Sequence, residues 1–91
     1  MYKVFYHRRV QKQFRRLTQS DRKKVAEKIK LLSHNPNNLQ LNIAPYLEAK
    51  KSWRIRIGNL RAIYTIDKNL QTILVEYLGF RGSVYKGHWL M

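Results

Sequence analysis

Residues 53–64 constrain the fold more than any other part of the chain. They read WRIRIGNLRAIY, so that apolar residues alternate with Arg54 and Arg56 before Gly58-Asn59. Alternation with a period of two predicts a strand with its apolar side chains on one face and its arginines on the other. Gly58-Asn59 predicts a tight turn into a second strand.

A two-residue turn at this position would set the register of the hairpin. Ile57 would then pair with Leu60, and Arg56 would lie opposite Arg61 on one sheet face. Like charges side by side destabilise a sheet unless an anion relieves the repulsion. The chain has 19 Lys and Arg against five Asp and Glu, a formal net charge of +14. We therefore expect a polyanionic partner, nucleic acid ahead of an acidic protein or an anionic membrane surface.

Two amphipathic helices are predicted before this hairpin. A short aromatic strand is expected at residues 2–6. Apolar residues then recur with helical spacing over residues 10–17 and again over residues 25–32, each stripe having a basic outer face. Residues 18–21 supply an N-cap for the second helix, and Pro36 ends it.

The remainder predicts three strands, at residues 53–57, 61–67 and 72–78, whereas residues 39–51 are expected to form a loop over the core. The predicted fold class is α+β in the order βααβββ. Its antiparallel sheet would be covered on one face by the N-terminal helical hairpin, and the other face would be open. The length suits one domain, residues 1–91.

Composition excludes several classes of site. The chain has no cysteine, its three histidines are scattered, and its carboxylates do not cluster, so neither a metal site nor a cofactor is expected. Carboxylate pairs, nucleophilic triads and glycine-rich phosphate loops are missing. There is no spanning apolar run and no signal-peptide pattern, so we expect a soluble cytoplasmic protein without a membrane partner.

Phosphate chemistry without a metal remains compatible with this composition. In such a reaction the RNA 2′-hydroxyl attacks the phosphorus, and cations stabilise the developing negative charge. The arginine fork binds phosphate at two points, and a tyrosine can orient the phosphate or stack on a base. The candidate catalytic residues are Arg54, Arg56, Arg61, Arg81 and Tyr85, and the candidate RNA-binding residues are Lys50, Lys51 and His88.

Three aromatic residues near these candidates are assigned to packing. Trp53 shares the apolar face of its strand, so we expect it in the core. Tyr64 and Tyr77 are expected to pack in the core or across neighbouring strands.

The segment WRIRIGNLRAIY, followed by an Ile-Asp loop, a hydrophobic strand and LGFRGSVY, resembles the RelE/ParE superfamily of bacterial toxins from type II toxin–antitoxin pairs. The likeness covers nearly the whole chain. In RelE-like members the corresponding basic positions, a later arginine and a tyrosine form the RNA-cleaving site. The resemblance implies a metal-independent endoribonuclease that cuts mRNA in the ribosomal A site, leaving a cyclic phosphate and a 5′-hydroxyl. It also implies a cognate antitoxin as partner.

The first two basic positions depart from the best-known RelE pattern, because Arg54 and Arg56 replace lysines. Arginine stays protonated at neutral pH and is a poor base. The general base is therefore left open among Tyr85, His88 and a group on the ribosome or RNA. Two alternative functions also stay open: a ParE-like inhibitor of DNA gyrase, and a non-catalytic module that binds RNA or an acidic antitoxin.

Overall fold

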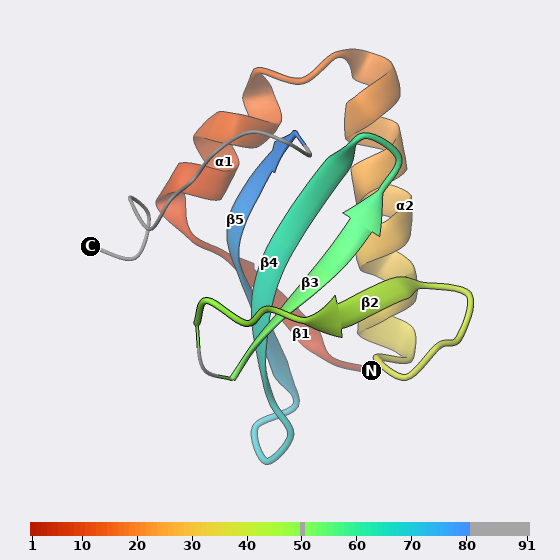
Figure 1. Cartoon of the computed structure of the whole chain (residues 1–91), viewed down its shortest axis with the longest axis vertical. Helices are drawn as coiled ribbons and strands as arrows, with labels where there is room; N and C mark the ends of the chain where they lie inside the picture. Colours follow the sequence, from red (N-terminus) through yellow and green to blue (C-terminus); the bar gives the residue numbers. More distant parts are fainter. Residues whose placement is uncertain (50, 81–91) are drawn as a thin grey trace.

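The computed structural model describes residues 1–49 and 51–80. Two helices pack against one sheet, which confirms the predicted α+β class (Figure 1). The helices are α1 (Arg8–Arg15) and α2 (Gln19–His34). The strands are β1 (Lys3–Tyr6), β2 (Asn42–Pro45), β3 (Ser52–Ile57), β4 (Leu60–Asp67) and β5 (Thr72–Phe80).

The strands lie in the order β1-β5-β4-β3-β2 within a single sheet. The β3–β4 and β4–β5 pairs are antiparallel as predicted, and β2 pairs antiparallel with β3. In contrast, β1 runs parallel to β5, with Lys3 opposite Thr72. The sheet is therefore mixed, which corrects the prediction of an antiparallel sheet. A parallel pair needs a crossover connection, and here the two helices carry the chain from β1 at one edge to β2 at the other (Figure 1).

The segment predicted as a loop, residues 39–51, contains the additional strand β2. Ile43 lies opposite Ile55, and Pro45 lies opposite Trp53. Proline is tolerated because β2 is an edge strand, where a missing N–H leaves no partner unsatisfied. The order is therefore βααββββ. Four residues ending in proline are too short a pattern to distinguish a strand from a loop.

Both helices begin with a side-chain cap. The Thr18 hydroxyl accepts a hydrogen bond from the backbone N–H of Asp21 at 3.1 Å, which confirms the predicted cap of α2. The His7 ring nitrogen Nδ1 accepts from the backbone N–H of Arg9 at 3.1 Å and caps α1. Within residues 1–49 and 51–80, no helix combines the length and apolar character needed to cross a membrane.

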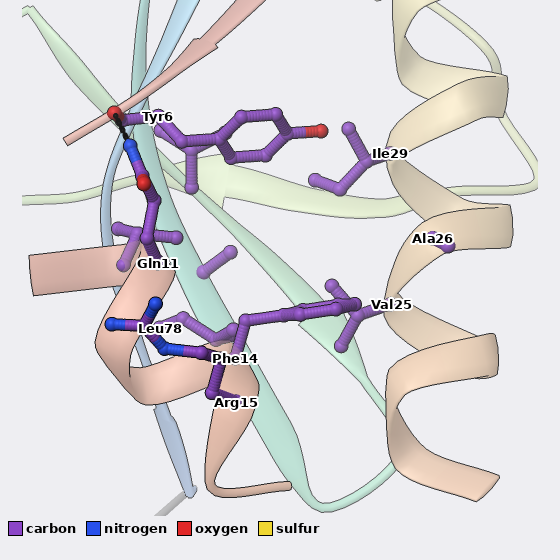
Figure 2. Close-up of a pocket in the computed structure, with 11 residues that line it drawn as sticks. Tyr6, Gln11, Phe14, Arg15, Val25, Ala26, Ile29 and Leu78 are labelled. Carbon is purple, nitrogen blue, oxygen red and sulfur yellow. Dashed lines mark hydrogen bonds between the residues drawn. The ribbon is translucent and has the colours of Figure 1, made fainter. Parts of the chain in front are cut away.

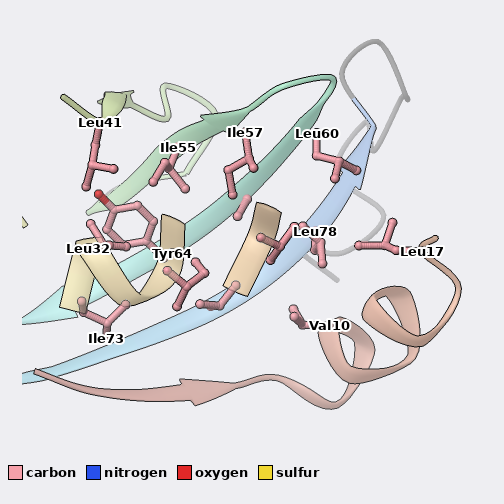
Figure 3. Packing of buried hydrophobic residues seen from close by; sticks show 14 residues of the cluster. Val10, Leu17, Leu32, Leu41, Ile55, Ile57, Leu60, Tyr64, Ile73 and Leu78 are labelled. Atoms are coloured by element: carbon pink, nitrogen blue, oxygen red, sulfur yellow. The ribbon is translucent and has the colours of Figure 1, made fainter. Parts of the chain in front are cut away.

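The core lies between the helices and one sheet face (Figure 3). Ile55 and Ile57 are 0% and 1% exposed, as the alternation of β3 predicts. Trp53 shares their face but is 37% exposed, so its predicted core position is wrong. It pairs with Pro45 at the end of the short edge strand and lines a cavity of about 470 Å³ together with Leu41.

An apolar groove of about 400 Å³ separates α1 from α2 over the sheet. Phe14 of α1 and Val25 of α2 point into it, together with Tyr6 from β1 (Figure 2). Burial raises the pKa of the Tyr6 phenol above its ordinary value. Ala26 lines the same groove and is exposed. We call this feature the helix groove.

Candidate nucleic-acid interface

The β3–β4 hairpin has the predicted register. Ile57 pairs with Leu60, and Arg56 lies opposite Arg61. Gly58, the first of the two turn residues, has a φ of +60°, whereas the second, Asn59, does not have a positive φ. That combination corresponds to a type II′ turn, whose twist matches the twist of the strands that it joins. The two-residue turn therefore sets the register that places Arg56 opposite Arg61.

Three of the predicted catalytic arginines lie together on the sheet face away from the helices. Arg54 and Arg56 alternate with core residues along β3, and Arg61 lies opposite Arg56 on β4. Arg54 and Arg61 are half-buried, whereas Arg56 is exposed. Cβ atoms of directly opposite residues are about 4.5–5.5 Å apart, so these guanidinium groups can converge on one phosphate. We call this surface the arginine face.

The other predicted site residues are placed only in part. Lys51 is exposed in the turn that leads into β3. Lys50, Arg81, Tyr85 and His88 lie outside the residues that the structure describes. The structure thus brings together Arg54 and Arg56 of β3 with Arg61 of β4, and it places Lys51 just before β3.

The arginine face is partly covered, contrary to the prediction of an open face. Ile63 faces away from the helices and is nevertheless 0% exposed. Tyr46, from the segment after β2, packs on it together with Ala49 and Tyr77. The Tyr46 hydroxyl donates a hydrogen bond to Oε2 of Glu48 at 2.7 Å. This second apolar cluster therefore flanks the arginines on one side.

A register shift in β5 decides the face on which Tyr77 lies. Tyr64 is opposite Val75 and Ile63 is opposite Tyr77, so Glu76 has no partner on β4. One extra residue in a strand is a β-bulge, and bulges re-aim the side chains that follow. Without it, Tyr77 would follow Val75 onto the core face. The predicted cross-strand packing of Tyr77 is confirmed, but its position on the arginine face could not be predicted from alternation.

The ring of Tyr77 lies along β5 over Gly79. A Cβ atom added to Gly79 would be 2.6 Å from the Tyr77 hydroxyl oxygen and 2.9 Å from the ring carbons Cε2 and Cζ. Gly79 is also the cross-strand partner of Arg61. The Tyr77 hydroxyl therefore occupies the place in the row of Arg56 and Arg61 that a side chain at position 79 would take. This contact was not predicted from the sequence, although a glycine inside a strand signals a close approach.

Two carboxylates among the described residues accept hydrogen bonds from groups other than the arginines. Glu48 accepts from Tyr46, and Asp67 accepts from the backbone N–H groups of Asn69 and Leu70 at 2.9 and 3.0 Å. In the described ranges no three metal-ligating side chains form a group. The arginine face can bind the charge of a phosphate through guanidinium forks.

Comparison with known proteins identifies the family. The family model described as ParE toxin of type II toxin-antitoxin system, parDE, matches residues 4–82. The chain belongs to the ParE toxin family, within the RelE/ParE superfamily. No curated protein sequence matches this ParE-family toxin significantly.

Solved RelE structures share the fold of this ParE-family toxin. The archaeal RelE–RelB complex from Pyrococcus horikoshii matches with a TM-score of 0.78 at 22% identity, covering 91% of this chain and 98% of that chain. Isolated RelE from E. coli gives 0.75 at 15% identity, covering 93% and 89%. The RelBE2 toxin–antitoxin complex from Mycobacterium tuberculosis gives 0.73 at 22% identity, covering 88% and 98%. At these identities the likeness shows the fold.

Proposed function

We propose that this toxin is a ribosome-dependent endoribonuclease that cleaves mRNA in the A site and so stops translation in the cytoplasm. The observation that supports the proposal most directly is the clustering of Arg54, Arg56 and Arg61 on one face of a RelE-like sheet. Phosphate recognition by several converging arginines requires no metal ion.

The proposed reaction is an internal transesterification. The 2′-oxygen forms a bond to the adjacent phosphorus while the bond from phosphorus to the 5′-oxygen breaks. A base removes the proton of the 2′-hydroxyl, and an acid supplies a proton to the departing 5′-oxygen. The products are a 2′,3′-cyclic phosphate and a 5′-hydroxyl. Negative charge grows on the non-bridging oxygens in the transition state, so fixed cations there lower the barrier.

Each predicted residue has a role in this proposal. Arg61, together with Arg81, would hold and neutralise the reacting phosphate, and Arg81 would donate the proton to the leaving oxygen. Arg54 and Arg56 would fix the neighbouring backbone. Tyr85 would position the phosphate or stack on a base. The remaining predicted residues, Lys50, Lys51 and His88, would extend the contact with RNA.

The proposal includes an antitoxin, because the chain belongs to a family of type II toxin–antitoxin pairs. The solved RelE from Pyrococcus horikoshii is in complex with RelB. An acidic antitoxin segment would complement the net charge of +14 and cover the arginine face. An apolar helix face of the same antitoxin would fill the helix groove.

The test of the nuclease compares induced wild type with Arg61→Ala. We expect wild type to arrest growth and to produce discrete cuts within translated codons, detected by primer extension, and Arg61→Ala to lose both. Arg8→Ala is the matched control, because Arg8 is exposed on α1, across the sheet from the arginine face. Equal cutting by wild type and Arg61→Ala would contradict the assignment of Arg61. Complex formation with the antitoxin without arrest would favour a non-catalytic module.

Inhibition of DNA gyrase is the second candidate, and it is favoured by the ParE description of the matching family model. In that case induction should produce an SOS response without cuts in mRNA. The purified protein should also block supercoiling by gyrase in a plasmid assay. Neither effect is expected from the nuclease.

A further inference from the structure

We propose that the hydroxyl of Tyr77 is a further catalytic group, donating a hydrogen bond to a non-bridging oxygen of the phosphate held by Arg56 and Arg61. The reaction in which it would act rests on the proposed function, whereas its placement rests on geometry alone. The family resemblance assigns its tyrosine to position 85 and gives no role to Tyr77.

The placement follows from strand register and from the space at Gly79. Arg56 is opposite Arg61, and Arg61 is opposite Gly79, so the three positions form one row across β3, β4 and β5. The Tyr77 hydroxyl oxygen lies 2.6 Å from where a Cβ of Gly79 would be. A direct cross-strand neighbour lies about 4.5–5.5 Å away. The hydroxyl therefore lies beside Arg61 in this row, where it can approach an oxyanion bound between the two arginines.

The ring is held in this orientation from both sides. The bulge at Glu76 turns Tyr77 to the arginine face, and Ile63 and Tyr46 pack with it in the second apolar cluster. The backbone of Gly79 supports the far end of the ring. A donor that is already fixed where charge develops needs no reorganisation during the reaction, which is the condition for effective transition-state stabilisation.

The chemistry of a phenol suits this position. Arg56 and Arg61 already repel each other, so a third cation in their row would increase the repulsion in the free protein. A tyrosine hydroxyl donates a hydrogen bond without carrying a charge at neutral pH. It therefore adds a contact to phosphate oxygen without destabilising the unbound site.

The alternative is that Tyr77 only packs against Ile63, which phenylalanine would do equally well. Tyr77→Phe keeps the ring and removes the hydroxyl, so it separates the two roles. Tyr64→Phe is the matched control, because Tyr64 lies on the neighbouring strand but faces the core and is 2% exposed. Circular dichroism and thermal melting establish that both variants are folded.

Two measurements test the proposal. In single-turnover cleavage of mRNA on programmed ribosomes, we expect Tyr77→Phe to lower the rate constant of cleavage at saturation about 10- to 100-fold, the loss typical of one donor to a charged oxygen. The half-saturating toxin concentration should change less than about threefold. The second measurement is a ribosome-free titration with inorganic phosphate, followed through the NMR signals of the Arg61 and Gly79 amides. We expect the Kd of Tyr77→Phe for phosphate to be about three- to tenfold higher than that of wild type. Tyr64→Phe should match wild type in both.

The outcomes distinguish this proposal from the proposed function. If wild type cleaves mRNA and Tyr77→Phe matches it in rate and phosphate affinity, the role of Tyr77 is wrong and the nuclease assignment stands. If wild type does not cleave but Tyr77→Phe still weakens phosphate binding, the nuclease assignment falls and Tyr77 stands as a phosphate ligand. Equal losses in Tyr77→Phe and Tyr64→Phe would show a general effect of removing a hydroxyl and would overturn the proposal.

Discussion

Arg56 lies directly opposite Arg61 on the face of the β3–β4 hairpin that the helices leave uncovered. Both side chains carry a fixed positive charge, so their proximity opposes folding and favours anion binding at the same time. The repulsion therefore lowers the free energy of unfolding of the free protein at the site where the proposed substrate binds. Both the stability and the affinity for phosphate can be measured.

Arg56→Gln should stabilise the free protein while weakening phosphate binding, because exposed Arg56 lies opposite Arg61. Relief of one like-charge contact is expected to raise the free energy of unfolding by about 0.2–1 kcal/mol at low ionic strength. Urea denaturation in about 0.02 M and about 0.5 M salt checks this, because the gain should shrink as salt screens the repulsion. Lys24→Gln, on the exposed side of α2, is the charge-matched control. A loss of stability at low salt would contradict the repulsive pairing.

Gly79→Ala should destabilise the protein through Tyr77. The new methyl group would meet the phenol at 2.6–2.9 Å, and overpacking of this kind costs about 1–3 kcal/mol. In a Tyr77→Ala background the same change should cost less than about 0.5 kcal/mol, because the obstructing ring is gone. A double-mutant cycle from urea denaturation measures the coupling, and additive effects would place the ring elsewhere.

Tyr64 should make the fold sensitive to alkaline pH. Burial raises its pKa to about 12 from 10.0, so the folded state holds the phenolic proton more tightly than the unfolded state does. The stabilisation is complete below about pH 10 and is lost as the pH rises through about 12. Relative to Tyr64→Phe, wild type should lose on the order of 1–2 kcal/mol over that range. Urea denaturation at about pH 8, 10 and 11 tests this; parallel pH profiles would refute it.

Ala26→Glu should block the antitoxin without affecting cleavage. Ala26 is exposed in the helix groove, across the sheet from the arginine face. A carboxylate there would be buried against an apolar partner, a cost of several kcal/mol. Calorimetric titration with the antitoxin should show at least a tenfold loss of affinity, while ribosome-dependent cleavage stays at the wild-type rate. Ser20→Glu, exposed on the same helix outside the groove lining, carries the same added charge and should bind normally.

The arginine pair could be predicted from sequence because every determinant is local. Alternation along β3 sets the faces, and Gly58 allows the two-residue turn that sets the register. The cap at Thr18 was predictable for the same reason, since a side chain and a backbone group three residues apart satisfy each other. Features that depend only on a few neighbouring residues can be predicted because contacts with distant segments do not change them.

The remaining features depend on contacts between distant segments. The edge strand β2 has only four residues and ends in Pro45, so its sequence does not predict a strand. It forms because its backbone pairs with β3. Trp53 lies on the expected face, but no sequence pattern shows that this end of the sheet is left partly uncovered. Tyr77 faces the arginines because one residue of β5 has no partner on β4. No pattern of residue types in this strand predicts the position of that bulge.

The bulge at Glu76 decides which residues of β5 face the core. Val75 on one side and Leu78 on the other both enter the core only because one residue between them is left unpaired. Deleting Glu76 would remove the extra residue, and Val75, Tyr77 and Leu78 would then keep their present faces in a strand of regular alternation. The bulge therefore lets β5 hold one residue more than β4 offers partners for, without exchanging the core face and the arginine face beyond it.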